Sequence, residues 1–201
     1  MVPALSEIAL PYGLSVWSGK LPDTHLPDPE TFNKIWALHP EEYHQIHIHG
    51  RDVATPRWQQ AYGMDYHYTG RTNGALPVVP ILAPFLAWGQ GLDARLNGLL
   101  LNWYDAEKGH YIGAHRDSTT NMIPDCPIVT LSLGATRNFR FRPWKGLKNL
   151  PEGPAFTDLL VPHGSVVLIP YATNLRYTHE VPHSKSHGGR RISITLRGFV
   201  S

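Results

Sequence analysis

Apolar and polar residues change their spacing along the chain, and this change predicts two helices followed by a series of short strands. Asp28-Pro29-Glu30 has the residue types of a helix start, and the apolar positions between it and Pro40 recur at helical spacing. A second helix is predicted over about residues 80–96. Beyond it, Gly and Pro separate short apolar stretches that predict strands at residues 99–104, 128–133, 138–141, 165–169 and 192–196.

Residues 43–70 combine strand-like alternation with many aromatic side chains. Apolar and polar residues alternate between Gln45 and Gly50, and three tyrosines follow within the same segment. We interpret this segment as strands and loops of a substrate lid. Residues 1–27 are rich in Pro and turn residues and are expected to wrap the surface.

Short strands between frequent turns are typical of a sandwich or a double-sheet jelly roll. Gly and Pro number 18 each, which disfavours a helix bundle, and 201 residues suit one domain. We therefore predict a mainly β fold with flanking helices, in a single domain over residues 1–201. Residues 1–95 would form an N-terminal extension and substrate lid, and residues 96–201 the jelly-roll core.

Composition narrows the class of protein. Hydrophobic residues make up 42% and charged residues 17% of the chain, which favours a globular protein over a charged disordered one. Cys126 is the only cysteine, so an intrachain disulfide and a cysteine-rich zinc site are excluded.

No apolar stretch approaches the roughly 20 residues that a membrane helix needs. We expect a monomer without membrane partners, in the cytoplasm, or in the nucleus of a eukaryotic cell.

The net charge of +2 does not by itself indicate binding to nucleic acid. Basic residues nevertheless cluster in two places, which could contact phosphates or could be ordinary solvated surface. The clusters contain Arg137, Arg140, Arg142, Lys145 and Lys148, and then Lys185, Arg190 and Arg191.

His115-Arg116-Asp117 has the spacing of two metal ligands on one strand. Side chains at positions i and i+2 of an extended strand share a face, so His115 and Asp117 can reach one point while Arg116 points away. Two histidines and one carboxylate form the facial triad of non-haem Fe(II) oxygenases, which leaves positions open for a chelating 2-oxo acid and dioxygen.

The triad needs a distal histidine, and four candidates follow: His163, His179, His183 and His187. His179 follows the predicted strand at residues 165–169 and a loop at residues 170–174, whereas His183 and His187 lie in a polar segment that resembles an exposed loop. We therefore choose His179 as the third ligand.

The last predicted strand carries an alternating polar face. Polar residues occupy positions 191, 193, 195 and 197, and apolar residues lie between them. Arg191 and Arg197 would stand about 20 Å apart along the strand, with Ser193 and Thr195 between them. Guanidinium groups pair with carboxylates in a bidentate manner, so this face suits a dicarboxylate such as 2-oxoglutarate. Asn102 and Tyr104 share a face of an earlier strand and could hydrogen-bond the same molecule.

In this order, the motifs resemble the signature of the AlkB family of Fe(II)- and 2-oxoglutarate-dependent dioxygenases, and especially its eukaryotic-type DNA repair members. The resemblance covers about residues 43–199. It rests on Asn102-x-Tyr104, His115-x-Asp117, His179 and Arg191-x5-Arg197, with further similarity at Pro56-Arg57, Tyr62-Gly63 and Arg137-x-Phe139-x-Phe141-Arg142.

The resemblance implies a double-stranded β-helix core and oxidative removal of N-alkyl groups from nucleobases of DNA or RNA, with formaldehyde, succinate and CO2 as products. It implies Fe(II) on His115, Asp117 and His179, with dioxygen as co-substrate. The residues implied to hold 2-oxoglutarate are Asn102, Tyr104, Arg191, Thr195 and Arg197, and Ser193 lies on the same face.

A base would then bind between the iron and the lid. We expect Tyr62, Tyr66 or Tyr68 to stack on it or contact its edge, and Thr119 to contact it after His-x-Asp. The arginines expected on phosphates are Arg57, Arg137 and Arg142.

The sequence departs from the family pattern at three positions. Ser118-Thr119-Thr120 stands where repair members carry acidic residues that read the damaged base, and Ser193 stands where Asn is common. Ile48-His49-Gly50 replaces an apolar finger that invades the duplex, so we expect single-stranded or unpaired nucleic acid to be preferred.

Three other functions stay open. The same oxidative chemistry could act on a small molecule or a protein side chain, and the missing acidic residues and low net charge favour that reading. A jelly roll could also be a non-catalytic binding module, but the complete set of metal and arginine positions argues against it. A hydrolytic zinc site would leave the arginine strand unexplained.

Overall fold

The structure is a computed structural model that describes residues 5–48, 50–68, 71–144, 155–183 and 188–200. Three α-helices, α1 (Pro29–Trp36), α2 (Ala83–Gln90) and α3 (Tyr171–Arg176), accompany two short 3-10 helices, Pro11–Gly13 and Asp23–His25. The strands are β1 (Ser6–Leu10), β2 (Leu14–Lys20), β3 (Gln45–Ile48), β4 (Arg51–Ala54), β5 (Trp58–Tyr62), β6 (Tyr66–Tyr68), β7 (Arg71–Asn73), β8 (Gly98–Asp105), β9 (Ile112–His115), β10 (Ile128–Gly134), β11 (Arg137–Pro143), β12 (Thr157–Val161), β13 (Ser165–Ile169), β14 (Tyr177–Val181) and β15 (Arg190–Arg197).

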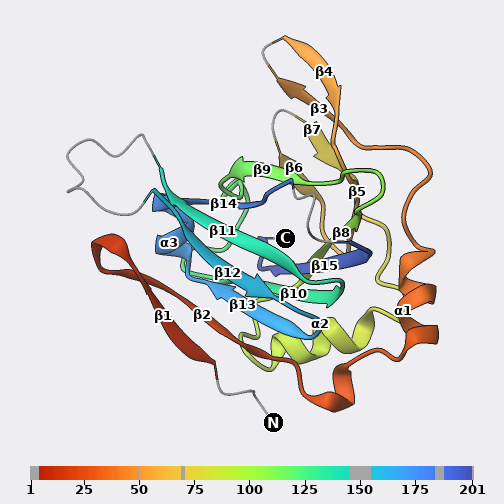
Figure 1. Cartoon of the computed structure of the whole chain (residues 1–201), viewed down its shortest axis with the longest axis horizontal. Helices are drawn as coiled ribbons and strands as arrows, with labels where there is room; N and C mark the ends of the chain where they lie inside the picture. Colours follow the sequence, from red (N-terminus) through yellow and green to blue (C-terminus); the bar gives the residue numbers. More distant parts are fainter. Residues whose placement is uncertain (1–4, 49, 69–70, 145–154, 184–187, 201) are drawn as a thin grey trace.

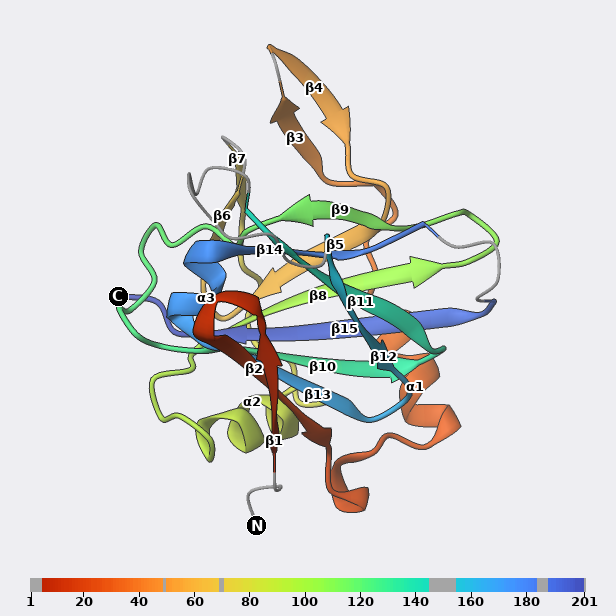
Figure 2. The same cartoon turned by 60° about the vertical axis from the view of Figure 1, so that its left-hand side comes forward.

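Two antiparallel sheets form the body of the molecule. The larger has the order β1-β2-β13-β10-β15-β8-β5, and the smaller has the order β12-β11-β14-β9. Figure 2 shows β9 and β14 lying over β8 and β15, so the sheets face each other as two layers. This arrangement confirms the predicted mainly β fold with a jelly-roll core.

The larger sheet is buried on both faces, which explains why its central strands are so apolar. One face carries alternate residues such as Leu101, Trp103 and Ile194, which pack with α1 and α2 in one core cluster. The other face meets the smaller sheet in a second cluster that includes Leu100, Phe139 and Phe141. Small polar residues of the central strands also lie on this inner face. Burying such residues is costly unless they form hydrogen bonds.

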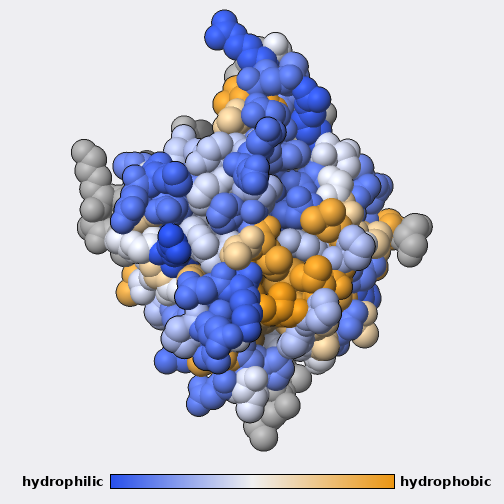
Figure 3. All heavy atoms as spheres, turned by 90° about the vertical axis from the view of Figure 1, so that its right-hand side faces the viewer, coloured by the Kyte–Doolittle hydropathy of each residue, from blue (hydrophilic) through white to orange (hydrophobic). Residues whose placement is uncertain are grey.

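The β3–β4 hairpin projects from this body (Figure 1). All four residues of β4 are exposed, and the projection has a mainly hydrophilic surface (Figure 3). Its turn contains Ile48-His49-Gly50, the segment expected in place of an apolar finger, but His49 and the side chain of Ile48 lie outside the described residues. A second small hairpin, β6–β7, carries Tyr66 toward the space between the sheets.

The helix predicted from Asp28 is confirmed. The Asp28 Oδ1 atom accepts a hydrogen bond from the Thr31 amide at 2.7 Å, as expected of an N-cap. The second predicted helix is shorter than expected, since α2 covers only Ala83–Gln90. The stretch at residues 170–174, predicted as a loop, instead begins α3.

The expectation that residues 1–27 merely wrap the surface is wrong. β2 pairs with β13, and β1 pairs with β2, so the N-terminal segment extends the larger sheet. β5 also joins this sheet at its opposite edge. A boundary at residue 95 therefore does not separate an extension from the core. The backbone explains this outcome, because the edges of β13 and β8 have donors and acceptors that pair with whichever extended segment lies beside them.

Gly134 ends β10 at a position that only glycine fits. Its φ is +84°, and an added Cβ would clash with the Arg190 carbonyl oxygen. We expect Gly134→Ala to lower the free energy of unfolding by about 1–3 kcal/mol or more, because backbone strain and a backbone clash coincide. Chemical denaturation would measure this. Gly74→Ala is the matched control, since its Cβ would meet no atom within 4 Å, and an equal loss in both variants would contradict the explanation.

Candidate active site

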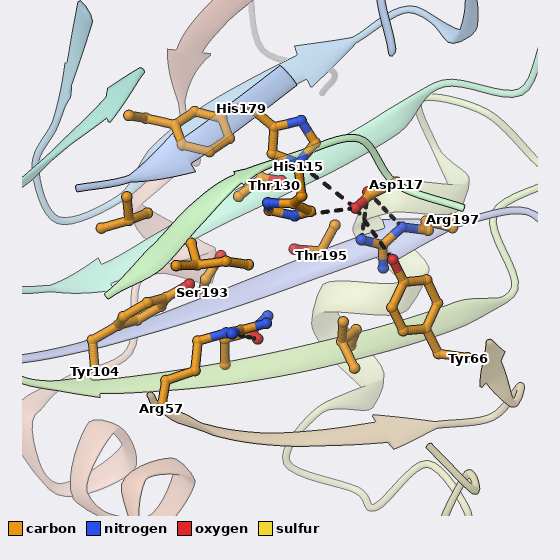
Figure 4. A pocket seen from close by; sticks show the side chains of 15 residues that line it. Arg57, Tyr66, Tyr104, His115, Asp117, Thr130, His179, Ser193, Thr195 and Arg197 are labelled. Atoms are coloured by element: carbon orange, nitrogen blue, oxygen red, sulfur yellow. Dashed lines mark hydrogen bonds and ion pairs between the residues drawn. The ribbon is translucent and has the colours of Figure 1, made fainter. Parts of the chain in front are cut away.

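Two histidines and one carboxylate converge between the sheets. The Asp117 Oδ1 atom lies 3.6 Å from the Nε2 atoms of both His115 and His179. One potential ligand atom from each residue lies within 4.8 Å of the others. Figure 4 shows the three side chains pointing toward one another on one side of the cavity. Donor atoms bound about 2.1 Å from one ion stand up to roughly 4.2 Å apart, so the two 3.6 Å separations leave room for a metal.

Strand pairing and one buried amide position these side chains. His115 and His179 lie opposite each other on the neighbouring strands β9 and β14. β9 ends at His115, and the backbone at Asp117 is held instead by Asn174 of α3. The Asn174 Oδ1 atom accepts from the Asp117 amide at 3.0 Å, and its Nδ2 atom donates to the Asp117 carbonyl at 3.1 Å. This pair of hydrogen bonds fixes the carboxylate next to the histidines.

The protonation states suit metal binding. Burial would raise the pKa of Asp117, but Arg197 and the two histidines outweigh it and hold that pKa well below its usual range. Burial and the neighbouring His179 lower the pKa of His115. The His115 Nδ1 atom lies 2.8 Å from the Gly113 carbonyl, which can only accept, so the proton lies on Nδ1 and the Nε2 lone pair faces the cluster.

The opposite wall of the cavity is the inner face of the larger sheet. Asn102, Thr130, Ser193 and Thr195 all line the cavity. Their alignment follows from strand register, because Ser193 pairs with Asn102 and Thr195 with Thr130. The alternation predicted for the last strand therefore places Ser193, Thr195 and Arg197 in the cavity, and Tyr104 lines it as well.

Arg191 lies on the same inner face of β15, beyond the residues that line the cavity, and has unusual surroundings. It is 1% exposed, and its Nη2 atom donates to the Ser132 Oγ atom at 2.9 Å. Its guanidinium carbon lies 5.0 Å from the centre of the Tyr104 ring. The Nε and Nη1 atoms are buried without a hydrogen-bond partner among the described residues. A buried cation with two orphaned donors is costly unless an anion binds beside it.

Several residues predicted to contact substrate have other roles. Tyr62 is 2% exposed and packs in the core on the helix side of the larger sheet, so it is not available for stacking on a base. Arg137 is 3% exposed and donates to the carbonyls of Thr136, Gly188 and Gly189 at 3.0–3.2 Å, so it cannot serve as a phosphate contact.

The remaining predicted contacts differ in their positions. Arg57 lines the cavity instead of facing outward toward phosphates, and Tyr66 lines it too, donating to the Asp117 Oδ1 atom at 3.2 Å. Thr119 lines an adjoining groove. Arg142 donates to Glu180 at 2.7 Å and is therefore not a free cation. The side chain of Tyr68, together with Lys145, Lys148 and Lys185, lies outside the described residues.

Sequence reasoning missed Asn174, Thr130, Arg116 and Gln59, the last of which accepts a hydrogen bond from Arg57. Asn174 looked like a loop residue, and its role depends on a contact 57 positions away. Thr130 lies on a largely apolar strand, where two polar residues on one face, Thr130 and Ser132, were the available signal. Arg116 was expected to point away, yet it lines the groove beside the metal cluster.

A jelly roll with two histidines and one carboxylate in its interior has the ligand set that is typical of non-haem Fe(II) oxygenases. The sequence also matches the 2OG-Fe(II) oxygenase superfamily over residues 33–197. The chain therefore belongs to this superfamily, and its relatives place it in the AlkB family. Membership implies Fe(II), 2-oxoglutarate and dioxygen as cofactor and co-substrates.

The relatives are similar over most of this chain. Human DNA oxidative demethylase ALKBH2 is 30% identical over 161 residues, which cover 78% of this chain and 61% of the human protein. The mouse protein of the same name is also 30% identical, with 78% and 67% covered. The match thus spans less than two thirds of the human relative. The solved structure of OsALKBH1 superposes with a TM-score of 0.55 at 14% identity, covering 90% of this chain and 97% of that one, which shows the shared fold.

The residues present fit the implied groups. The histidine and carboxylate donors match Fe(II), and the unpartnered nitrogen atoms of Arg191 could pair with an anion such as a carboxylate of 2-oxoglutarate.

In the described part of the chain, no helix has the length and apolar character of a membrane span.

Proposed function

We propose that this protein is an Fe(II)- and 2-oxoglutarate-dependent dioxygenase that removes N-alkyl groups from nucleobases of DNA or RNA. The alkyl carbon is oxidised and leaves as formaldehyde, dioxygen is consumed, and 2-oxoglutarate becomes succinate and CO2. The observation that carries the proposal is the metal cluster in a cavity that Arg197 lines, with the buried Arg191 just beyond the lining beside Tyr104. The names of the ALKBH2 relatives support a nucleic acid substrate.

The chain's own residues bind and orient the reactants. His115, Asp117 and His179 would hold the iron, which when bound supplies oxygen activation coupled to decarboxylation of 2-oxoglutarate. Arg197 donates through Nε to the Asp117 Oδ2 atom at 2.8 Å, which keeps that carboxylate ionised and oriented. The proposed ligands of 2-oxoglutarate are Asn102, Tyr104, Arg191, Ser193, Thr195 and Arg197. Apolar Leu100, Ile112, Phe139 and Val181 line the same cavity and exclude water from it.

A groove of about 440 Å³ adjoins the metal cluster and offers a path for substrate. It is lined by Arg116, Ser118, Thr119 and Thr120, among others. The Arg116 guanidinium stacks 3.9 Å from the centre of the Trp144 ring, which is 39% exposed. An arginine beside an exposed aromatic ring suits a phosphate next to a stacked base. A base can reach the buried cluster only when unstacked, so we retain single-stranded or unpaired nucleic acid as the preferred substrate.

The direct test supplies the iron-loaded protein with 2-oxoglutarate, dioxygen and a panel of methylated oligonucleotides. We expect succinate, formaldehyde and demethylated base in equal amounts, detected by mass spectrometry. Succinate formation with no demethylation of any oligonucleotide would contradict the proposal and favour a small molecule or a protein side chain as substrate.

Arg116→Ala should weaken binding of single-stranded DNA and reduce its salt dependence. Each lost phosphate contact lowers the slope of log affinity against log salt by about 0.7. Fluorescence anisotropy at several salt concentrations, without dioxygen, would measure it. Lys20→Ala, on β2 in the larger sheet, is the charge-matched control. If the two variants changed the slope equally, Arg116 would not be a phosphate contact.

A further inference from the structure

The cavity and the adjoining groove carry very little negative charge. Among the described residues that line them, Asp117 is the only carboxylate. Its two oxygen atoms are already engaged, because Oδ1 faces the histidines and accepts from Tyr66 while Oδ2 accepts from Arg197. No described acidic side chain of this site is left to pair with a positively charged substrate.

The cavity contains a positively charged side chain whose charge no described carboxylate neutralises. Arg57 is 4% exposed and lines the cavity. Its Nε atom donates to Asn102 Oδ1 at 2.7 Å, and its Nη2 atom donates to Gln59 Oε1 at 2.9 Å. Both partners are neutral amides, so the guanidinium is held rigidly without neutralisation of its charge. Figure 4 shows it reaching into the cavity between Tyr104 and Tyr66.

The field of Arg57 extends to its neighbours. After burial, the charge of Arg57 is the next cause that lowers the pKa of His44. Arg57 also contributes to the lowered pKa of His110, where burial is again the main cause. In the groove, Arg116 forms no ion pair with any described carboxylate and donates instead to the Leu175 carbonyl at 2.9 Å. Arg57 and Arg116 therefore border the substrate path as cations that have no described carboxylate as a partner.

The geometry points to a neutral base with two carbonyl groups, an N3-alkylated thymine or uracil, as the preferred substrate of this site. This inference rests on the proposed function and specifies the lesion. A guanidinium only donates hydrogen bonds, so Arg57 matches the carbonyl oxygen atoms of such a base. Methylation at N1 of adenine or N3 of cytosine instead gives a cation, which must be desolvated beside Arg57 without a free carboxylate to receive it.

Ser118 and Thr119 complete the argument on the groove side. Both follow Asp117 directly, both line the groove, and both carry neutral hydroxyl groups. A hydroxyl group can donate to a carbonyl oxygen of a neutral base, but it cannot stabilise a cation as a carboxylate does. Thr119→Glu is therefore the substitution that should change the charge preference of the site.

The experiment compares three single-stranded oligonucleotides of one sequence that differ in the modified base: 3-methylthymine, 3-methylcytosine or 1-methyladenine. Binding is measured by anisotropy with iron and 2-oxoglutarate but without dioxygen, and demethylation is measured in pairwise competition at pH 7. We expect 3-methylthymine to be favoured over both cationic bases by about tenfold or more in both measurements. Thr119→Glu should shift the ratio toward the cationic bases by about tenfold.

One control variant and one further test variant accompany this comparison. Ser6→Glu adds the same charge on the remote strand β1 and should leave the ratio unchanged. Arg57→Gln removes the cavity cation and should also raise the relative preference for the cationic bases. Preference of the wild-type protein for the cationic bases would overturn this inference while leaving the proposed function intact. No demethylation of any of the three bases would overturn the proposed function and this inference together.

Discussion

His179→Ala is expected to lower 2-oxoglutarate turnover by more than about 100-fold, whereas His183→Ala should leave it near the wild-type level. His179 is 6% exposed, and its Nε2 atom lies 3.6 Å from the Asp117 carboxylate, so the variant removes one of three ligands. Changes to residues that merely orient metal ligands already cost about 10–100-fold. His183 is exposed, and its ring lies beside Tyr111, away from the cluster.

Turnover should be read together with metal binding. Titration with Co(II), followed by its visible absorption, would show weaker binding for His179→Ala and unchanged binding for His183→Ala. His115→Ala and Asp117→Ala should also abolish turnover. Asp117→Ala additionally leaves Arg197 as a buried unpaired cation, so its thermal unfolding must be measured too. Normal turnover in His179→Ala, with turnover lost in His183→Ala, would transfer the third ligand to His183.

The metal cluster could be predicted because two of its ligands, His115 and Asp117, lie two positions apart in the sequence, so that only His179 had to be chosen from a distant segment. The i and i+2 spacing correctly brought His115 and Asp117 together, but for an incomplete reason. β9 ends at His115, and Asn174 holds the backbone that carries Asp117. No local pattern could reveal this, since the hydrogen bonds of Asn174 join segments far apart in the sequence.

The wrong substrate contacts share a physical cause. Tyrosine and arginine are amphipathic, so either can lie at a surface or be buried with its polar end satisfied. Arg137 satisfies carbonyl groups near residue 188, and Tyr62 packs under the larger sheet. Strand parity predicted the face of Arg191, Ser193 and Thr195 because a buried strand has only two faces. It could not predict that Arg191 lies beyond the cavity lining, against Ser132 and Tyr104, because that depends on the neighbouring strands β10 and β8.

Arg191→Lys should weaken the apparent affinity for 2-oxoglutarate by about 10- to 100-fold, equivalent to roughly 1.5–3 kcal/mol for a charge-assisted pair. Lysine keeps the charge but loses the fork that can pair with a carboxylate. Arg190→Lys is the matched control, because Arg190 is exposed and lies over the Trp36 ring at 5.0 Å. Isothermal titration without dioxygen would measure both, and equal affinities in the two variants would remove Arg191 from the site.

Arg191→Met separates binding from structural support, because the two roles predict opposite signs. If the guanidinium mainly stabilised the fold, its loss would destabilise the ligand-free protein. Because its Nε and Nη1 atoms are buried without partners, we expect the ligand-free Arg191→Met protein to be as stable as the wild type, or more stable by about 1–3 kcal/mol. At 100 times its Kd, 2-oxoglutarate should stabilise the wild type by about 2.7 kcal/mol and so raise its melting temperature, and the same variant should lose this rise. Thermal unfolding with and without 2-oxoglutarate measures both effects. A large loss of ligand-free stability would assign Arg191 to the core rather than to the co-substrate.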